Sequence, residues 1–338
     1  MIKGAIIGLG KMGLSHAAIV GAHPEVETVA VCDSSSFILD AFRKFSKVKT
    51  YSDFQKMINE EKPEFVVIAT PTKFHYPMVK FALEKGLHVF CEKPFTLTTK
   101  QGRDLMELAL SKGLVNQVGF HNQFIGTFRE LKRLLEKNVL GELVHFSGEA
   151  YGPVVIKEKG STWRSNPEEG GGCLYDYASH VINLVQEVIG RPEKIYGTIL
   201  KSIYSKDVED AVYSLMKLKN GVSGTLLVNW SDETYRKMAT SLTVQGKKGK
   251  IICDATEIKI FLNEPSLSEK LDKGWTIKYI TDFAIPVNFY LRGEEYSAQI
   301  DYFVDCINNN RQPQYNSFEQ ALYTDRVIEM IVENAKNI

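Results

Sequence analysis

The stretch Gly8-Leu9-Gly10-Lys11-Met12-Gly13 decides the fold of the N-terminal part of this chain. It follows the apolar run Ala5–Ile7 and precedes an amphipathic segment. A G-x-G-x-x-G pattern in this position predicts a turn from a buried strand into a helix that holds a dinucleotide. Gly8 allows a tight bend, Gly10 lets backbone amides approach a pyrophosphate, and Gly13 lets the helix lie close to the strand.

An acidic residue follows this turn at the distance that a dinucleotide site requires. Asp33 closes the apolar run Val29–Cys32 and lies twenty positions after Gly13. Its carboxylate can accept hydrogen bonds from both hydroxyl groups of the adenosine ribose. It would also repel a 2′-phosphate, and the neighbouring Ser34 brings no cation. The spacing therefore favours a dinucleotide site over a structural glycine turn, and it favours NAD, with NADP as the alternative cofactor.

Length and composition indicate a globular protein with two domains. The 338 residues exceed one comfortable core. The 41 lysines and arginines equal the 41 aspartates and glutamates, which argues against nucleic acid or a membrane surface as a main partner. No apolar stretch reaches spanning length and no signal peptide is evident, so we expect a cytoplasmic protein. The five cysteines are scattered, so we expect them to be reduced and mostly buried, with no metal site.

Residues 1–122 alternate short apolar runs with helical patterns. The runs expected to form strands are Ala5–Ile7, Thr28–Cys32, Phe65–Ala69, His88–Cys91 and Gln117–Phe120. Short strand–helix–strand units predict an α/β domain with a doubly wound parallel (Rossmann) sheet. Ligands bind beyond the carboxyl ends of such strands, so we expect the loops that follow the strands to converge on the cofactor.

Residues 123–293 show a different pattern, with several strands in a row and few helices. The dipeptide Asn220-Gly221 between two apolar runs predicts a β-hairpin. This region is therefore expected to be an α+β substrate-binding domain on an open, mostly antiparallel sheet. Two further helices, within about 294–338, are expected to return to the nucleotide domain.

Helices should cover only one face of that open sheet. Apolar residues expected on the other face, such as Leu215, Leu226 and Val228, favour contact with a partner subunit. We therefore expect a homo-oligomer formed through the open sheet.

Glu92-Lys93-Pro94 follows the predicted strand His88–Cys91, at the end where the nicotinamide half of the cofactor should lie. Proline favours an extended conformation at the preceding Lys93 and makes a rigid mount for its ammonium group. In a partly desolvated cleft, Lys93 could orient a substrate hydroxyl or stabilise a developing alkoxide, with Glu92 as its tether. The alternative, an ordinary lysine in a surface turn, is less favoured at this position.

Asp176 and His180 lie four positions apart, after the glycine run Gly170–Gly172. Residues with this spacing share a helix face, so we expect the two side chains to project together, away from most of the packing. A neutral imidazole can accept a hydroxyl proton as hydride departs, and a carboxylate can orient it. Glycines are poor helix formers, so we expect this run to allow close approach by substrate or cofactor. The alternatives are a surface ion pair or half of a zinc site, for which no third ligand is apparent.

For the other candidate residues, a purely structural role is about as plausible as a functional one. His75 could contact the cofactor or cap the helix that follows it. Trp163 and Arg164 precede the glycine run and could form a wall of the substrate site, although a packed tryptophan is equally plausible. Trp230 is expected to lie in the core.

Taken together, these motifs resemble the Gfo/Idh/MocA oxidoreductase family over essentially the whole chain. The resemblance implies a nicotinamide-dependent dehydrogenase or reductase that acts on a sugar, a cyclitol or a nucleotide-linked sugar. It also implies that Lys93 and His180 handle the proton, that Asp176 orients the substrate or the histidine, and that the protein forms a dimer or tetramer. Residues expected to contact the cofactor are Gly8, Gly10, Lys11, Met12, Gly13, Asp33, Ser34, Thr70, Pro71, His75, Glu92 and Lys93. Residues expected to contact the substrate are His121, Asn122, Trp163, Arg164 and Tyr177.

One segment departs from the family pattern. After the fifth predicted strand the family often has Gly-Phe-Asn-x-Arg-Phe, whereas this chain has His121 and Gln123 in place of the asparagine and the arginine. The loss of a fixed charge bears on the choice of substrate rather than on cofactor binding.

Two other functions remain open at this point. A branch of the same family consists of glycoside hydrolases that use NAD transiently. A non-catalytic dinucleotide- or sugar-binding regulator would be expected to lack the set Lys93, Asp176 and His180, which this chain retains.

Overall fold

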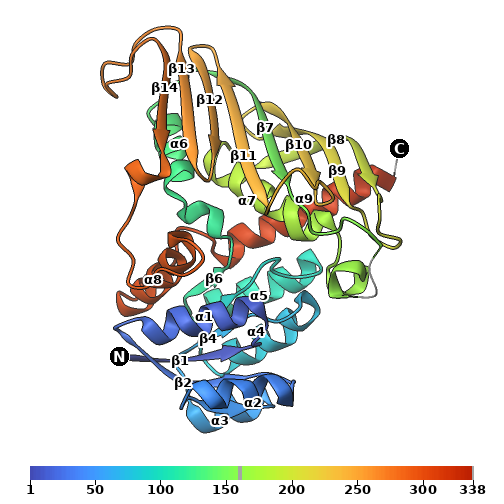
Figure 1. Cartoon of the computed structure of the whole chain (residues 1–338), viewed down its shortest axis with the longest axis vertical. Helices are drawn as coiled ribbons and strands as arrows, with labels where there is room; N and C mark the ends of the chain where they lie inside the picture. Colours follow the sequence, from blue (N-terminus) through green and yellow to red (C-terminus); the bar gives the residue numbers. More distant parts are fainter. Residues whose placement is uncertain (159–161, 337–338) are drawn as a thin grey trace. The chain divides into compact units, whose positions relative to one another are not determined.

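The computed structural model describes residues 1–158 and 162–336. The chain forms two compact units. The first unit contains Met1–His121 and Pro286–Asp325, and the second contains Asn122–Ile285 and the remainder of the C-terminal segment. Figure 1 labels most of the elements of both units.

The first unit is built on a six-stranded parallel sheet in the order β3-β2-β1-β4-β5-β6. Its strands are β1 (Ile2–Ile7), β2 (Val26–Cys32), β3 (Lys49–Tyr51), β4 (Phe65–Ile68), β5 (His88–Cys91) and β6 (Asn116–Val118). The predicted doubly wound sheet is confirmed. The short edge strand β3 was missing from the prediction because its residues Lys49, Thr50 and Tyr51 form no apolar run.

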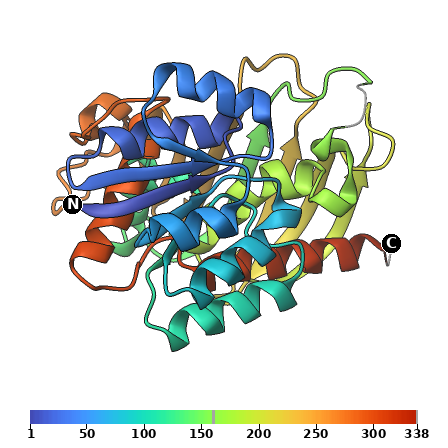
Figure 2. The same ribbon diagram turned by 90° about the horizontal axis from the view of Figure 1, so that it is seen from below.

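Both faces of this sheet are buried, and the sequence of each strand shows why. In β4, Phe65 and Val67 belong to one hydrophobic cluster, whereas Val66 and Ile68 belong to the other. Successive side chains of a strand point to opposite faces, so a continuous apolar run is what a sheet covered on both sides requires. Figure 2 shows helices on both sides of the strands of this sheet.

Seven helices pack on the parallel sheet or contribute to this unit. They are α1 (Lys11–Ala22), α2 (Ser36–Phe45), α3 (Phe54–Glu61), α4 (His75–Glu84), α5 (Thr99–Ser111), α8 (Glu294–Asn308) and the start of α9 (Phe318–Lys336). Helix α8 packs beside α1. Its Phe303 ring meets Phe65 and Phe90 edge-on, at centroid distances of 5.7 and 5.9 Å.

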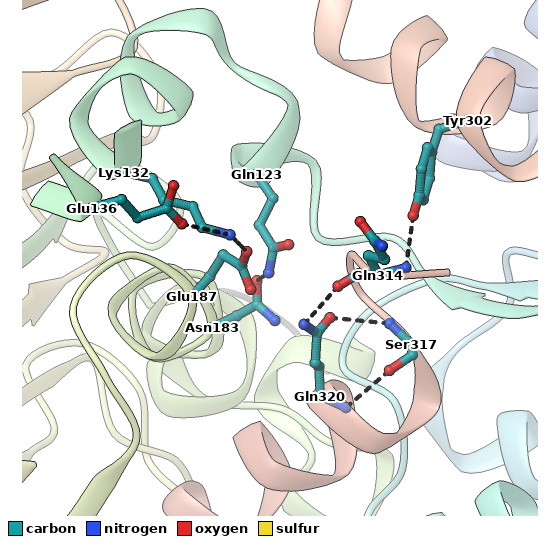
Figure 3. A network of polar contacts seen from close by, with 9 residues as sticks. All are labelled: Gln123, Lys132, Glu136, Asn183, Glu187, Tyr302, Gln314, Ser317 and Gln320. Atoms are coloured by element: carbon teal, nitrogen blue, oxygen red, sulfur yellow. Dashed lines mark hydrogen bonds and ion pairs between the residues drawn. The ribbon is translucent and has the colours of Figure 1, made fainter. Parts of the chain in front are cut away.

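The beginning of α9 is held by a polar network (Figure 3). The amide nitrogen of Gln320 donates to the hydroxyl of Ser317, and its side-chain oxygen accepts from the Ser317 amide. The Gln320 side chain also donates to the carbonyl of Gln314, whose own amide donates to the hydroxyl of Tyr302 on α8. The end of α9 belongs to the second unit, where Asn334 accepts a hydrogen bond from the amide of Thr198.

The second unit contains an eight-stranded sheet in the order β14-β13-β12-β11-β7-β10-β9-β8. Its strands are β7 (Leu143–Tyr151), β8 (Pro192–Lys201), β9 (Ala211–Leu218), β10 (Ser223–Asn229), β11 (Ala239–Gly246), β12 (Gly249–Asp254), β13 (Glu257–Leu262) and β14 (Gly274–Tyr279). All neighbouring strands are antiparallel except β7 and β10. The predicted open, mostly antiparallel sheet is confirmed, and so is the hairpin at Asn220-Gly221, where Gly221 has φ +88°.

Helices α6 (Gly126–Glu136) and α7 (Ser179–Val188) pack on this sheet. Leu226 and Val228 are buried, which corrects their predicted place on an exposed face. Leu215 is 51% exposed. The strand β10 alternates buried and partly exposed residues, so Leu226 and Val228 necessarily share the buried face.

The described residues include no helix that is long and apolar enough to cross a membrane. All five cysteines are buried, as predicted, and none of them forms a disulfide in the described part of the chain.

Candidate functional site

The glycine turn at the carboxyl end of β1 has the geometry that a dinucleotide requires. Gly8 has φ +92°, and a Cβ there would lie 2.5 Å from the carbonyl oxygen of Ala69. A Cβ on Gly13 would lie 1.8 Å from the carbonyl oxygen of Gly8, so only glycine lets α1 approach the strand this closely. A Cβ on Gly10 would meet no atom within 4 Å.

The first turn of α1 contains no acidic residue and its N-terminus has no side-chain cap, within the described helix. The space beside Gly10 is open, and the first turn of a helix carries amides without intrahelical partners and the positive end of the helix dipole, which suit a pyrophosphate. Lys11 is exposed and Met12 is half-buried at this turn. The residues present fit a dinucleotide.

The carboxylate of Asp33 is fixed at the carboxyl end of β2. One oxygen accepts from the amide of Leu9 at 2.6 Å, and the other accepts from the amide of Ser35 at 2.8 Å. The first bond ties Asp33 to the glycine turn. Asp33 is only partly buried, and Ser34 beside it is exposed. Each oxygen keeps a further lone pair for a ribose hydroxyl.

Lys93 lies in the loop after β5, between the buried Glu92 and the buried Pro94. The Lys93–Pro94 peptide bond is cis. The amide of Lys93 donates to one oxygen of Glu92 at 3.2 Å, while the other oxygen lies 2.6 Å from Nε2 of His16 on α1. The Glu92 carboxylate thus holds the backbone of Lys93, and His16 in turn holds that carboxylate. Sequence reasoning did not single out His16, although a histidine on a buried face of α1 is a detectable signal.

The loop continues into a second anchor. The amide and the hydroxyl of Thr96 both donate to the carboxylate of Asp325 on α9, at 3.0 and 2.9 Å. Burial of Thr96 and Asp325 makes this carboxylate an internal brace of the loop.

His75 is fully buried and its ring bridges two loops. Nδ1 lies 3.0 Å from the carbonyl oxygen of Pro94, and Nε2 lies 2.9 Å from that of Thr70. Burial lowers the pKa of His75, although the carbonyl contacts oppose the shift. The ring therefore links the loops after β4 and β5, and its predicted contact with the cofactor stays a prediction. Thr70 and Pro71 are half-buried at the same edge.

His121 follows β6 and stacks on Tyr296 of α8, with ring centroids 4.7 Å apart. The guanidinium of Arg292 lies 5.4 Å from the centre of the Tyr296 ring. Burial lowers the pKa of His121 to about 4; the charge of Glu92 opposes this shift, and the charges of Lys93 and Arg292 add to it. His121 is therefore neutral at pH 7. The partners Arg292 and Tyr296 had no signal in the sequence.

In the second unit, Asp176 lies in a π-helical turn, Leu174–Ala178, that leads directly into α7. Its carboxylate accepts from Nε of Arg164 at 3.0 Å, and the Arg164 guanidinium lies 4.4 Å from the centre of the Trp163 ring. Arg164 is 42% exposed at its side chain, whereas Asp176 is 8% exposed. The ion pair therefore places a carboxylate of fixed orientation below a partly exposed cation.

His180 occupies the first turn of α7 and is 3% exposed. Asp176 and His180 are both buried, so the expectation that they project away from the packing is wrong. The turn that holds Asp176 is π-helical, so the i, i+4 rule of a regular α-helix does not apply across it.

The protein's own backbone and side chains explain why glycines occupy the run Gly170–Gly172 before this helix. Gly170 ends a short helical turn with φ +81°. A Cβ on Gly171 would lie 2.4 Å from the carbonyl oxygen of Arg164, and one on Gly172 would lie 2.3 Å from Oε1 of Glu209. The same Glu209 oxygen accepts from the amide of Leu174 at 2.8 Å. The glycines accommodate the protein's own backbone and Glu209, which corrects their predicted role in substrate or cofactor approach.

Other predicted substrate contacts are mostly internal to the second unit. Tyr177 is 4% exposed and meets the buried Trp230 edge-on at 6.4 Å, so its ring packs in the core of this unit, and its predicted contact with the substrate stays a prediction. Asn122 is 3% exposed. The side chain of Gln123, which stands where the family often has arginine, donates to Asn183 of α7 at 2.8 Å (Figure 3).

A charged network flanks that contact. Lys132 on α6 pairs with Glu187 on α7 and lies 3.8 Å from Glu136 (Figure 3). It fastens α6 to α7, the helix that carries His180. Among the described residues, no group of three or more His, Cys, Asp or Glu side chains is arranged to hold a metal ion.

Two family models match this chain. The model described as "Oxidoreductase family, NAD-binding Rossmann fold" matches residues 2–120, and the model described as "GFO/IDH/MocA C-terminal domain" matches residues 128–252. The chain therefore belongs to the Gfo/Idh/MocA oxidoreductase family, as its motifs indicated, and it is an NAD(P)-dependent oxidoreductase.

The individual relatives reported below share only 20–28% of their residues with this chain. A D-glucoside 3-dehydrogenase of Escherichia coli (strain K12) is 28% identical over 270 residues, which cover 79% of this chain and 73% of that protein. A scyllo-inositol 2-dehydrogenase (NAD(+)) of Bacillus subtilis (strain 168) is 22% identical over 319 residues, covering 92% of this chain and 88% of that protein. The solved structure of a levoglucosan dehydrogenase in complex with NADH has the same fold, with a TM-score of 0.88 and 20% identity over 99% of this chain and 97% of the other.

Proposed function

We propose that this protein is a dehydrogenase that transfers hydride between the nicotinamide ring and a hydroxyl-bearing carbon of a sugar, a cyclitol or a nucleotide-linked sugar. The names of the relatives, a glucoside dehydrogenase and an inositol dehydrogenase, support this substrate class. The observation that carries the proposal is the position of Lys93. This residue is half-buried at the carboxyl end of β5, and its backbone is fixed between Glu92 and Pro94. That edge of a doubly wound sheet is where dinucleotides bind.

The proposed roles of the residues follow from their chemistry. The ammonium group of Lys93 donates a hydrogen bond to the reacting oxygen and stabilises negative charge as it develops there. The imidazole of His180 accepts the hydroxyl proton. Asp176, which pairs with Arg164, orients the substrate or that imidazole. When bound, the nicotinamide supplies the carbon that takes up or returns the hydride.

The cofactor preferred in this proposal is NAD. The carboxylate of Asp33 stands at the end of β2 with lone pairs available for the ribose hydroxyls. A 2′-phosphate would place negative charge beside this carboxylate, and its neighbours Ser34 and Ser35 carry no compensating charge. NADP is expected to bind more weakly.

We also propose that a second copy of the chain covers the open face of the eight-stranded sheet. One row of paired residues crosses this sheet from β8 to β14: Tyr196, Leu215, Thr225, Ser147, Thr243, Ile252, Lys259 and Ile277. Small hydroxyl side chains fill its centre, whereas Tyr196, Leu215 and Ile277 are 47, 51 and 48% exposed at its ends. Apolar ends around a flat centre suit a symmetric interface.

The oligomeric state tests this part of the proposal. Leu215→Glu should convert a dimer or tetramer into a smaller species in light scattering after size exclusion. Phe37→Glu is the matched control, since Phe37 is 80% exposed but lies on α2 of the first unit. A wild-type monomer, or equal dissociation in both variants, would contradict the interface.

The catalytic assignment is tested by assaying NAD reduction with inositols, free sugars and nucleotide sugars. Lys93→Ala and His180→Ala should each lower kcat by about 10²–10⁴-fold while NAD still binds, as expected for loss of proton-transfer assistance. Full activity in either variant would refute that residue's role. Release of an aglycone without net NADH would instead identify a glycoside hydrolase, and binding without turnover of any substrate would indicate a regulator.

A further inference from the structure

A buried histidine links the dinucleotide-binding helix to the loop that carries Lys93. His16 lies on α1 and is fully buried. Its Nε2 is 2.6 Å from Oε1 of Glu92, whose side chain is 10% exposed. The ring also meets Phe90 of β5 edge-on, at a centroid distance of 5.2 Å. The mechanism proposed above does not use His16.

The surroundings fix the proton on one nitrogen of this ring. Nδ1 of His16 is buried and has no hydrogen-bond partner among the described residues. A proton there would be desolvated without an acceptor, which costs about 1–3 kcal/mol. The proton therefore resides on Nε2, which donates to Glu92. Burial raises the pKa of Glu92, but the hydrogen bond from His16, the charge of Lys93 and the hydrogen bond from the Lys93 amide together hold this pKa below its usual value.

The carboxylate of Glu92 has little freedom in this position. Its second oxygen accepts from the amide of Lys93 at 3.2 Å. On another side it abuts Gly119, where a Cβ would lie 3.0 Å from Oε1. Removal of the His16 donor would leave the buried carboxylate with one side-chain partner fewer, and it would then shift or take up a proton.

We infer that His16 is a positioning residue for the reaction: by donating to Glu92, it fixes the backbone of Lys93 and so the place of the ammonium group beside the nicotinamide half of the cofactor. This inference rests on the role proposed for Lys93. Its range is local, since the adenosine half of the cofactor is held by the glycine turn and Asp33. Loss of the His16 hydrogen bond should therefore weaken binding of the nicotinamide half of the cofactor but not of the adenosine half.

Two substitutions separate the hydrogen bond from the packing. His16→Leu keeps an apolar side chain of similar size against Phe90 but offers no donor. His16→Gln offers an amide N–H that can reach Glu92. Glu92→Gln supplies the background for a double-mutant cycle, because a residue that acts only through Glu92 has no further effect once that carboxylate is gone.

The experiment compares two ligands that share the adenosine half. NADH is titrated by its fluorescence, and ADP-ribose, which lacks nicotinamide, is titrated by competition. In His16→Leu we expect NADH to bind about fivefold to tenfold more weakly, ADP-ribose to bind within twofold of the wild type, and kcat to fall about tenfold, as for a modest misplacement of a catalytic group. His16→Gln should restore most of both losses, and His16→Leu should add less than twofold to Glu92→Gln.

Equal weakening of NADH and ADP-ribose would overturn the inference, because His16 would then act on α1 itself. A lower melting temperature with unchanged NADH binding and kcat would also overturn it, because the contact would then serve packing alone. Failure of the proposed dehydrogenase function is a separate outcome: the wild type would turn over no polyol, while the ratio of the two binding constants would still report on His16.

Discussion

The two glycine-rich turns of this molecule look alike in sequence but differ in what surrounds them. In Gly8–Gly13 of the first unit, a Cβ on Gly10 would meet no atom within 4 Å. In Gly170–Gly172 of the second unit, a Cβ on Gly171 or Gly172 would lie within 2.4 Å of the protein's own oxygens. At Gly10 there is room for a ligand to approach, whereas at Gly171 and Gly172 the protein itself fills the space.

The largest expected effect comes from adding one methyl group to the first turn. Gly13→Ala places a Cβ 1.8 Å from the carbonyl oxygen of Gly8, so α1 must move away from β1. We expect a loss of about 3 kcal/mol in the free energy of unfolding, the upper range for overpacking a core. Urea unfolding monitored by circular dichroism measures it.

The matched variant is Gly10→Ala, which adds the same methyl group to open space. Its unfolding free energy should change by less than about 0.5 kcal/mol, as for surface substitutions. Its NAD affinity should fall at least tenfold, which corresponds to about 1.4 kcal/mol, because the methyl group occupies the approach of the pyrophosphate. If Gly10→Ala left NAD binding intact, the contrast between the two turns would lose its functional meaning.

A methyl group added to the second turn should lower both the free energy of unfolding and kcat. Gly172 has φ +103°, and its added Cβ would lie 2.3 Å from Glu209. Gly172→Ala should lower the unfolding free energy by about 2 kcal/mol, from left-handed strain and the contact together. It should lower kcat as well, because Glu209 holds the amide of Leu174 at the start of the helix that leads to His180.

Gly221→Ala is the control for strain alone. Gly221 has φ +88° in the hairpin, and a Cβ there would meet no atom within 4 Å. It should cost about 1 kcal/mol and leave kcat unchanged. Unchanged NAD affinity is expected in both variants; a selective loss of NAD binding in Gly172→Ala would show that this turn contacts the cofactor after all.

A smaller effect is expected where the first turn meets Asp33. The carboxylate accepts from the amides of Leu9 and Ser35, so Asp33→Asn keeps the shape but turns one acceptor into a donor. NAD affinity should fall about tenfold, or 1.4 kcal/mol, and the preference for NAD over NADP should narrow. The ratio of kcat/KM for the two cofactors measures this, and an unchanged ratio would remove Asp33 from cofactor selection.

The parts of the first unit that sequence could predict are those fixed by local patterns. Apolar runs such as Phe65–Ile68 alternate between two buried faces, so their burial follows from chemistry within a few residues. The glycine turn and Asp33 are likewise fixed by spacing along the chain. The fold of both units and the loops after β1, β2, β4 and β5 were therefore predictable.

The errors concern contacts between residues far apart in sequence. The interpretation of Gly172 failed because its neighbour Glu209 lies 37 positions later and belongs to no motif. The contacts of His75 were missed because nothing in the sequence shows that the carbonyls of Thr70 and Pro94 face its ring. The π-helical turn before His180 was missed because such a turn has no signature in a single sequence.

The smallest expected effect separates two neighbouring carboxyl groups of the second unit. Burial raises the pKa of Glu209, and the nearby charge of Asp210 adds to the shift. Burial also acts on Asp210, but hydrogen bonds from Ser205 and Trp230 outweigh it and lower its pKa. One carboxyl group therefore resists ionisation in the folded protein, whereas the other favours it.

The sign of the pH dependence follows from proton binding. As pH rises above about 4.3, the ordinary pKa of glutamate, an unfolded chain releases the Glu209 proton while the folded protein still holds it. The wild type should therefore lose stability relative to Glu209→Gln as the pH rises from about 4.5 to 7. Glutamine can still accept from the amide of Leu174, so the variant removes the titration and keeps the hydrogen bond. Urea unfolding of both proteins across this pH range measures the difference, and a difference that is constant or of opposite sign would mean that Glu209 is ionised in the turn.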